Sequence, residues 1–206
     1  KDDAEAKEKI IFSKKMLEKA VIHASATDSK TQVVSRIDLN SASGILRAAK
    51  ELLISDIVIG WQGKSKTTDR IFGTTLDELL RKSEQMVLVT KITHPLNTIK
   101  RVIVAVPPNA EKEMGFKRWV RKSKRLSRQT GSTLHFFCSK QTEEIIRPLA
   151  TELKPRIQAE FHLFSDWKKL ETLSKKITPD DLLILISARK GSVSYHNFLD
   201  SIPRKF

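Results

Sequence analysis

Cysteine, glycine and proline are all scarce in this chain. Cys138 is the only cysteine among 206 residues, so an internal disulfide is excluded and a reducing cytoplasm suits the sequence. Glycine and proline occur seven times each, beside 39% hydrophobic and 30% charged residues, which is typical of a soluble globular protein. The chain is long enough for one large domain or two small ones.

Long apolar runs are also missing. The stretch Leu182–Ile186 has the length of a buried strand, well short of the roughly 18 residues of a membrane span. The first residues, Lys1–Glu5, contain no apolar signal core, so nothing in them directs export.

Positive charge is abundant and unevenly distributed. The formal net charge is +14. Residues 1–96 hold 16 Lys or Arg against 13 Asp or Glu, whereas residues 97–206 hold 22 against 11. The second half should therefore attract anionic partners, either lipid headgroups, nucleic acid or an acidic protein surface.

Helical and extended patterns alternate along the chain and predict an α/β fold with mostly parallel sheets. We expect helices at 4–25, 40–54, 74–83, 111–129, 141–153 and 166–177, and strands at 31–37, 56–59, 85–90, 101–106, 133–137, 156–164 and 181–186. The order suggests two related Rossmann-like units, each incomplete. They are residues 1–94, which lack their first strands, and residues 101–206, which lack a final strand, joined by a linker at 95–100. We therefore expect the chain to be a piece of something longer.

A glycine-containing segment lies between a strand pattern and a helix pattern. The apolar run Asp56–Ile59 is followed by Gly60 and Gly63, then by Gly73, Thr74 and Thr75, where a helix should begin. Glycines let the backbone approach phosphate oxygens, and a helix N-terminus offers N–H donors and a positive dipole end. Lys64 would add charge. The pattern predicts a phosphate-binding loop, although a tight turn alone could also require the glycines.

The spacing Gly60-x2-Gly63-x9-Gly73-Thr74, after a hydrophobic strand that ends in glycine, resembles the nucleotide-binding signature of universal stress protein domains. The segments Phe72–Leu80 and Ser187–Ser192 are similar to the tandem stress-protein tail of bacterial cation/proton antiporters. This resemblance implies two units of the adenine nucleotide alpha hydrolase type. It also implies that Gly60, Gly63, Gly73 and Thr74 contact ATP or another adenine nucleotide.

The same resemblance implies a regulatory role for the chain. It would be a cytoplasmic domain of an inner-membrane antiporter, with the transporter domain of the same polypeptide and a second copy of the chain as partners. The second unit departs from the pattern, because its first strand ends in Val106-Pro107-Pro108 and its loop is Ser187–Ser192, so we expect it to be degenerate and structural. The alternatives are a stand-alone tandem stress protein that binds or slowly hydrolyses ATP, and a purely structural dimerisation tail.

A strongly basic helix is expected between Phe116 and Arg128. Phe116, Trp119 and Val120 share one side, and seven Lys or Arg residues occupy the remainder. The segment Lys117–Arg128 could lie against anionic lipid. We favour the alternative, a helix that packs on its own sheet and presents a solvated basic face. Nucleic-acid binding is disfavoured because the sequence contains no known nucleic-acid-binding module.

Neither catalysis nor metal binding is predicted. The five histidines are spread along the sequence without metal-ligand spacing, and His135 and Cys138 should point to opposite faces of one strand. No nucleophile elbow or P-loop lysine motif occurs. The sequence therefore favours a binding protein over an enzyme.

Overall fold

The computed structural model describes residues 2–25, 30–61, 73–152, 154, 156–164, 172–173 and 175–197. The chain divides into two compact units, residues 1–44 and residues 45–206. The predicted boundaries of the two related repeats, at 94 and 101, are based on the order of helices and strands along the sequence, and they stay a prediction.

The first unit begins with a long helix and contains one incorrect strand prediction. Helix α1 (Asp2–Ser25) confirms the predicted helix. Residues 30–38 form no strand, although 31–37 were predicted as one. Val33, Val34 and Ile37 are 46%, 40% and 93% exposed, and no described strand pairs with this segment. A strand needs a neighbour for its backbone hydrogen bonds, so alternation alone did not suffice here.

Helix α2 (Ser41–Glu51) begins where it was predicted but ends three residues early. The Asn40 side chain accepts a hydrogen bond from Ser43 N at 2.8 Å and so caps the helix. At the other end, Leu53 has a φ of 51° and Ile54 N donates to Ala49 O at 2.9 Å. This is the Schellman geometry that ends many helices, formed here without glycine.

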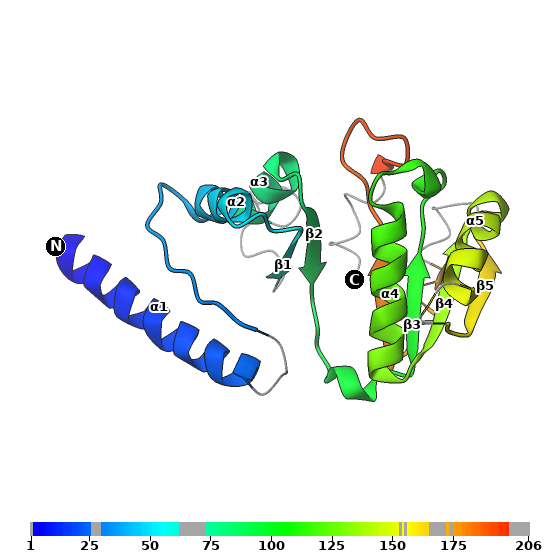
Figure 1. The fold of residues 1–206 in the computed structure, drawn as a ribbon, viewed down its shortest axis with the longest axis horizontal. Helices are drawn as coiled ribbons and strands as arrows, with labels where there is room; N and C mark the ends of the chain where they lie inside the picture. Colours follow the sequence, from blue (N-terminus) through cyan, green and yellow to red (C-terminus); the bar gives the residue numbers. More distant parts are fainter. Residues whose placement is uncertain are drawn as a thin grey trace. The chain divides into compact units, whose positions relative to one another are not determined.

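The second unit contains two parallel sheets (Figure 1). Strands β1 (Asp56–Gly60) and β2 (Met86–Thr90) pair with each other, and helix α3 (Thr74–Lys82) lies between them in sequence. The larger sheet has the order β5-β4-β3-β6. Its strands are β3 (Arg101–Ala105), β4 (Thr133–Cys138), β5 (Ala159–Leu163) and β6 (Asp181–Leu185). These parallel sheets confirm the α/β class.

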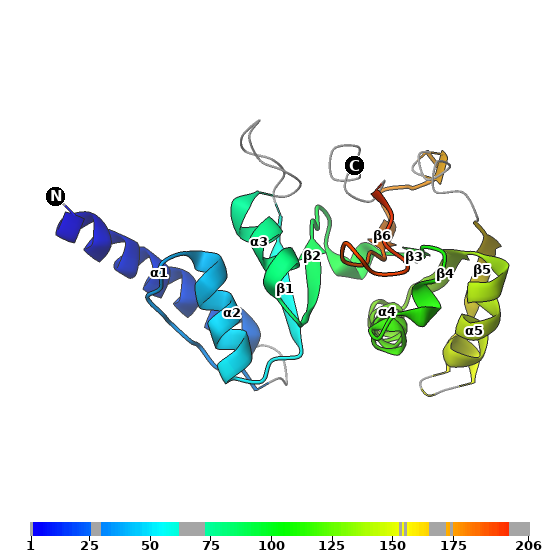
Figure 2. The same cartoon turned by 90° about the horizontal axis from the view of Figure 1, so that it is seen from above.

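Two helices cover one face of the four-stranded sheet. Figure 2 shows α4 (Phe116–Thr130) and α5 (Lys140–Thr151) side by side on the same face. The short helices η1 (Leu96–Thr98) and η2 (Ala110–Lys112) precede β3 and α4. Helix α4 was predicted from residue 111, but η2 and a turn occupy residues 110–115. Of the helix predicted at 166–177, only residues 172–173 are described as helical, and residues 165–171 and 174 lie outside the description.

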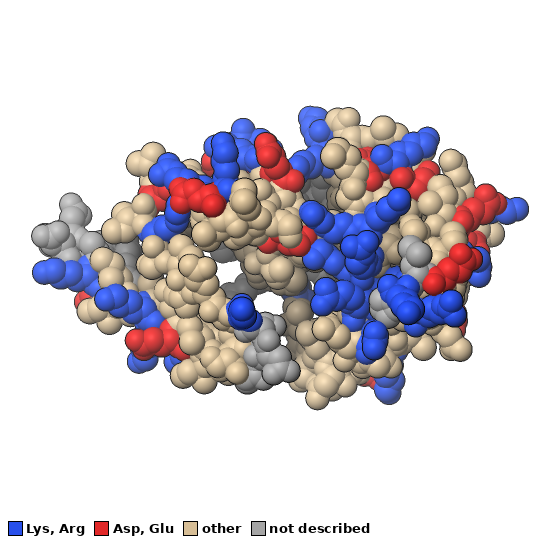
Figure 3. Space-filling model, viewed as in Figure 1, with Lys and Arg blue, Asp and Glu red and all other residues tan. Residues whose placement is uncertain are grey.

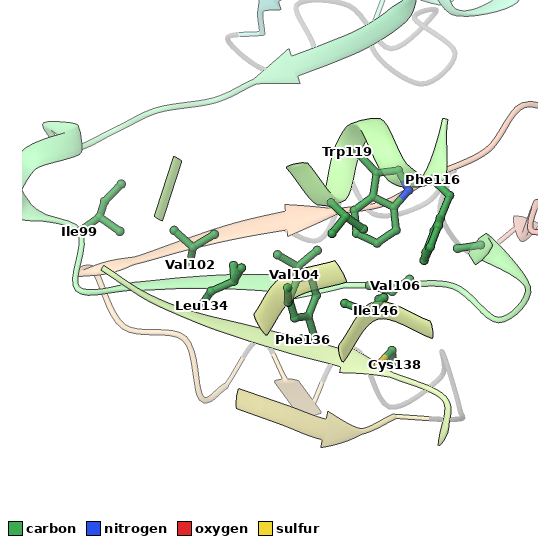
Figure 4. Close-up of a cluster of buried hydrophobic side chains, with 13 residues drawn as sticks. Ile99, Val102, Val104, Val106, Phe116, Trp119, Leu134, Phe136, Cys138 and Ile146 are labelled. Atoms are coloured by element: carbon green, nitrogen blue, oxygen red, sulfur yellow. The ribbon is translucent and has the colours of Figure 1, made fainter. Parts of the chain in front are cut away.

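The main core lies between this sheet and these two helices (Figure 4). Alternate residues of β3 and β4 point into it, and the aromatic side of α4 covers them. The buried members are Ile99, Val102, Val104, Val106, Ala110, Phe116, Trp119, Val120, Leu134, Phe136, Cys138, Ile146 and Ala150. The Phe116 and Trp119 rings meet edge to face, with centroids 5.2 Å apart. The prediction that α4 packs on its own sheet through its aromatic side is therefore confirmed.

Among the described helices, none combines the length and the apolar character needed to cross a bilayer.

Candidate functional site

The predicted phosphate loop is bounded by β1 on one side and α3 on the other. Gly60 is the last residue of β1 and pairs with Thr90 of β2. The backbone N–H of Trp61 continues this pairing by donating to Thr90 O at 2.8 Å. Gly63 and Lys64 lie within residues 62–72, outside the described residues. The flanking glycines and threonines are therefore the part of the predicted site that the structure places.

Gly73, Thr74 and Thr75 lie at the start of α3. Gly73 is the N-cap residue, and its carbonyl accepts the first helical bond from Asp77 N at 2.9 Å. Since glycine has no side chain, Gly73 itself provides no side-chain cap for the first turn of α3, whose N–H groups and positive dipole end lie at this end of the helix. Thr74 is exposed and Thr75 is half-buried. This is the arrangement that a bound phosphate can satisfy.

The two flanking glycines, Gly60 and Gly73, have different backbone conformations and surroundings. Gly73 has a φ of 108° and a ψ of 162°, a conformation that is essentially restricted to glycine. Gly60 has no positive φ, and a Cβ added there would meet no atom of the described residues within 4 Å. Turn geometry thus explains Gly73 but does not explain Gly60. An open space over the end of β1 is what close approach of a ligand to the backbone would require.

The segment Ser187–Ser192, which was predicted as the matching loop of a second repeat, begins a stretch that bonds to other parts of the protein. The Arg189 guanidinium donates to Gln85 O at 2.9 Å and to Ser83 Oγ at 3.1 Å. Ser194 donates from both N and Oγ to Glu113 Oε1, at 2.9 Å and 2.8 Å. These bonds hold Arg189 against the segment before β2 and Ser194, two residues beyond the loop, against the segment before α4.

Helix α4 presents a continuous basic surface. Lys117, Arg121, Arg125 and Arg128 are exposed and follow one another at spacings of three or four residues, so they form one stripe. Figure 3 shows Lys and Arg side chains gathered over the position of α4. Beside the stripe, Lys122 Nζ lies 3.0 Å from Asp56 Oδ2, and Arg118 donates to Ser55 O at 3.3 Å. We name the four-residue stripe the basic stripe.

One lysine of α4 was wrongly assigned to the solvated face. Lys124 is only 2% exposed, and its ammonium donates to Leu149 O in the last turn of α5 at 2.6 Å. Burial lowers the pKa of Lys124, and the positive charge of Arg121 lowers it further. A cation at a helix C-terminus is favourable, so Lys124 joins α4 to α5.

Sequence spacing also concealed a cluster of polar side chains on the other face of the large sheet. The parallel pairing of β4 with β5 brings His135, Glu160 and His162 together, although 27 positions separate the two histidines. Cys138 lies in the main core, so His135 and Cys138 do occupy opposite faces as predicted. The signal that could have revealed the cluster is the strand register, which the sequence did not supply.

Residues 1–91 match the model of the Universal stress protein family. The matched region includes β1, the glycine segment and α3, and reaches past the end of β2. Comparison with curated proteins gives no match. This part of the chain is therefore similar to universal stress proteins, as its glycine pattern indicated.

Proposed function

We propose that the chain is a regulatory module that binds an adenine nucleotide through the segment between β1 and α3. The observation that carries the proposal is the glycine pair: among the described residues, no atom lies within 4 Å of a Cβ placed on Gly60 at the end of β1, and Gly73, the N-cap residue of α3, provides no side-chain cap. The match of residues 1–91 to a family whose members often bind adenine nucleotides supports the same segment. The nucleotide would be ATP or a related adenine nucleotide.

Each residue of the proposed site has a distinct role. The backbone at Gly60 and Gly63 would approach the phosphates, and the N–H groups at Gly73, Thr74 and Thr75 would donate to phosphate oxygens. Lys64 would contribute a positive charge. We propose binding and not catalysis, since a hydrolase would need a positioned base and water, and no described residue is assigned as either.

Calorimetry with ATP, ADP and AMP tests this site on the whole chain. We expect wild-type protein to bind at least one of them and Gly60→Ala to weaken that binding, because a methyl group would enter the space over β1. Gly115→Ala is the matched control, since its Cβ would make only an ordinary contact at 3.6 Å with Met86 Cε. Equal affinities for wild type and Gly60→Ala would refute the assignment.

We further propose that the module belongs to a cation/proton antiporter and that the second repeat serves as its structural half. The second repeat again alternates strands and helices. Its sheet order β5-β4-β3-β6 places the topological switch point, where the strand order changes direction, between β3 and β6. Arg189 in its loop donates to Gln85 O, and Ser194, two residues beyond the loop, donates to Glu113, which favours a scaffold. In this role the nucleotide would shift the equilibrium between two states of the transporter, and the size of the shift would equal the difference in its binding free energy to those states.

The coding region upstream distinguishes this role from a stand-alone stress protein. A series of apolar spans would support the antiporter, whereas an immediate start codon would support the stand-alone protein. If the chain is a purely structural dimerisation tail, calorimetry should detect no heat with any adenine nucleotide. Sedimentation should then show a dimer that forms without nucleotide.

The basic stripe is the proposed contact with anionic lipid. Its four side chains are exposed, and the aromatic side of α4 is buried in the core, so lipid would meet charge only. Each charge near an anionic surface contributes about 1 kcal/mol. Vesicles with phosphatidylserine should retain wild-type protein but not Arg121→Glu/Arg125→Glu, and raised salt should release it. Equal retention by neutral vesicles would refute this contact.

A further inference from the structure

The cluster of His135, Glu160 and His162 is set by strand register. His135 on β4 is the Cα partner of Glu160 on β5, and His162 lies two residues beyond Glu160. Residues that pair across parallel strands, and residues two apart on one strand, point to the same face of a sheet. The three side chains therefore share the face opposite the main core, at the edge strand β5.

Three electron-pair donor atoms of this cluster converge. His135 Nδ1 lies 3.2 Å from His162 Nε2 and 3.3 Å from Glu160 Oε2, and His162 Nε2 lies 3.8 Å from the same carboxylate oxygen. A point equidistant from the corners of this triangle lies about 2.0 Å from each atom, which is close to the Zn–N and Zn–O bond lengths of about 2.0–2.2 Å. The triangle therefore has the size of one face of a metal coordination sphere.

The second ring nitrogen of His135 has a hydrogen-bond partner of its own. Thr133 Oγ1 can donate to Lys100 O at 3.3 Å and lies 2.9 Å from His135 Nε2. With the hydroxyl hydrogen directed at Lys100 O, Oγ1 accepts from Nε2–H, and this tautomer has a lone pair on Nδ1. A hydrogen bond of this kind is what orients histidines that bind metals. The Nδ1 lone pair faces a carboxylate oxygen at 3.3 Å, and a cation or a shared proton has to offset that repulsion.

The cluster has one buried and two more exposed members. The His135 side chain is only 11% exposed. The nearby cation Arg101 makes two hydrogen bonds to Asp181, at 2.7 Å and 2.6 Å, which offset its charge. His162 and Glu160 are 41% and 64% exposed, so an ion could enter from solvent and keep water as a further ligand.

We propose that His135 Nδ1, His162 Nε2 and the Glu160 carboxylate bind one divalent first-row transition-metal ion, with zinc as the best fit. Imidazole nitrogen with one carboxylate oxygen is a donor set that suits zinc and, less selectively, copper, nickel and cobalt. The two rings are 13° from parallel and their nitrogens face each other, so binding requires each ring to turn toward the ion. His162 is half-exposed and stacks on Phe137 with ring centroids 4.5 Å apart, so its ring would turn from that stacked position. The bound ion would tie the edge strand β5 to β4.

Cobalt(II) titration of the metal-free whole chain tests the site directly, because four-coordinate cobalt has intense visible bands that the aqueous ion lacks. We expect one cobalt per chain, displaced by one zinc. Removing an outer-shell partner of a metal ligand typically weakens binding about 10–100-fold, so we expect Thr133→Val to fall in this range and His162→Gln and Glu160→Gln to weaken binding at least as much.

The control variants are His94→Gln and Glu144→Gln, which change exposed residues outside the cluster and should bind cobalt as wild type does. Circular dichroism and thermal unfolding without metal would confirm that each variant is folded, and zinc should raise the midpoint of wild type but not that of His162→Gln. The proposal is overturned if wild type gives no four-coordinate spectrum, or if His162→Gln binds as tightly as His94→Gln. Without a four-coordinate spectrum, the close approach of the two histidines would be explained by a shared proton and not by a metal ion.

Discussion

Arg101 and Asp181 join β3 to β6 through a pair of parallel hydrogen bonds. Arg101 Nε lies 2.7 Å from Asp181 Oδ1, and Nη2 lies 2.6 Å from Oδ2. The two residues are register partners, and the Asp181 side chain is 1% exposed. The carboxylate also accepts from Thr178 N and Oγ1, at 2.8 Å and 3.0 Å. This carboxylate thus fixes the strand β6 beside the centre of the sheet.

Acid should destabilise the protein through Asp181. Burial alone would raise the pKa of this carboxyl, but the hydrogen bonds from Arg101 and Thr178 outweigh burial and lower it below 3.8. A group with a lowered folded-state pKa stabilises the fold above its unfolded pKa and loses that contribution as pH falls through the folded value. We expect Asp181→Asn to lower the free energy of unfolding at pH 7 by about 1–3 kcal/mol.

Urea unfolding at pH 7 and at pH 3 would measure this effect. Wild type should lose part of its stability between these pH values, and Asp181→Asn should lose less. An equal pH dependence in both proteins would contradict the role assigned to Asp181.

Lys124 should matter for stability where its neighbours on α4 do not. Lys124→Ala leaves Leu149 O without its ammonium partner and removes a buried side chain, so we expect a loss of about 1–3 kcal/mol. Lys117→Ala, in the exposed basic stripe, should change stability by about 0.5 kcal/mol or less. Thermal unfolding of both variants compares them, and equal effects would show that burial of Lys124 contributes nothing.

Cys138 should be unreactive in the folded protein. Burial in the main core raises the pKa of its thiol to about 12, with Glu143 and Glu111 adding to the shift. The thiolate is the nucleophile, so iodoacetamide at pH 8 should label the thiol slowly in native protein and rapidly in urea. Mass spectrometry over time would follow the labelling. Rapid native labelling would mean that the core opens at β4.

The two flanking glycines of the candidate site should respond differently to alanine. Gly73→Ala forces a side chain into a conformation restricted to glycine, and we expect a loss of about 1–3 kcal/mol. Gly60→Ala should leave stability within about 0.5 kcal/mol of wild type while it weakens nucleotide binding. Denaturant unfolding beside calorimetry separates the two effects. A large stability loss in Gly60→Ala would mean that the strand itself requires glycine there.

Local sequence patterns predicted most elements of the fold because strands and helices differ in period. The buried run Arg101–Ala105 and the amphipathic helix α4 depend on short-range spacing, which the sequence displays directly. The segment 31–37 has the same alternation, yet it forms no strand among the described residues. Pairing with a neighbour decides that outcome, and no spacing within the segment encodes it.

The candidate nucleotide site was predictable in part, for the same reason. Gly60, Gly73, Thr74 and Thr75 lie at the end of β1 and the start of α3, where the strand-to-helix pattern placed them. Gly63 and Lys64 lie outside the described residues. The sequence could not distinguish Gly60 from Gly73, since that distinction depends on a φ angle and on empty space.

By itself, the sequence determined an alternating α/β chain with a glycine-bounded segment before a helix and a basic, half-buried α4. These features follow from the order and type of neighbouring residues. Tertiary structure alone decided that His135 meets His162 and Glu160, and that Lys124 is buried while Lys117 is exposed. Such contacts depend on strand register and on which helix packs beside which, and both are fixed by the packing of residues far apart in the chain.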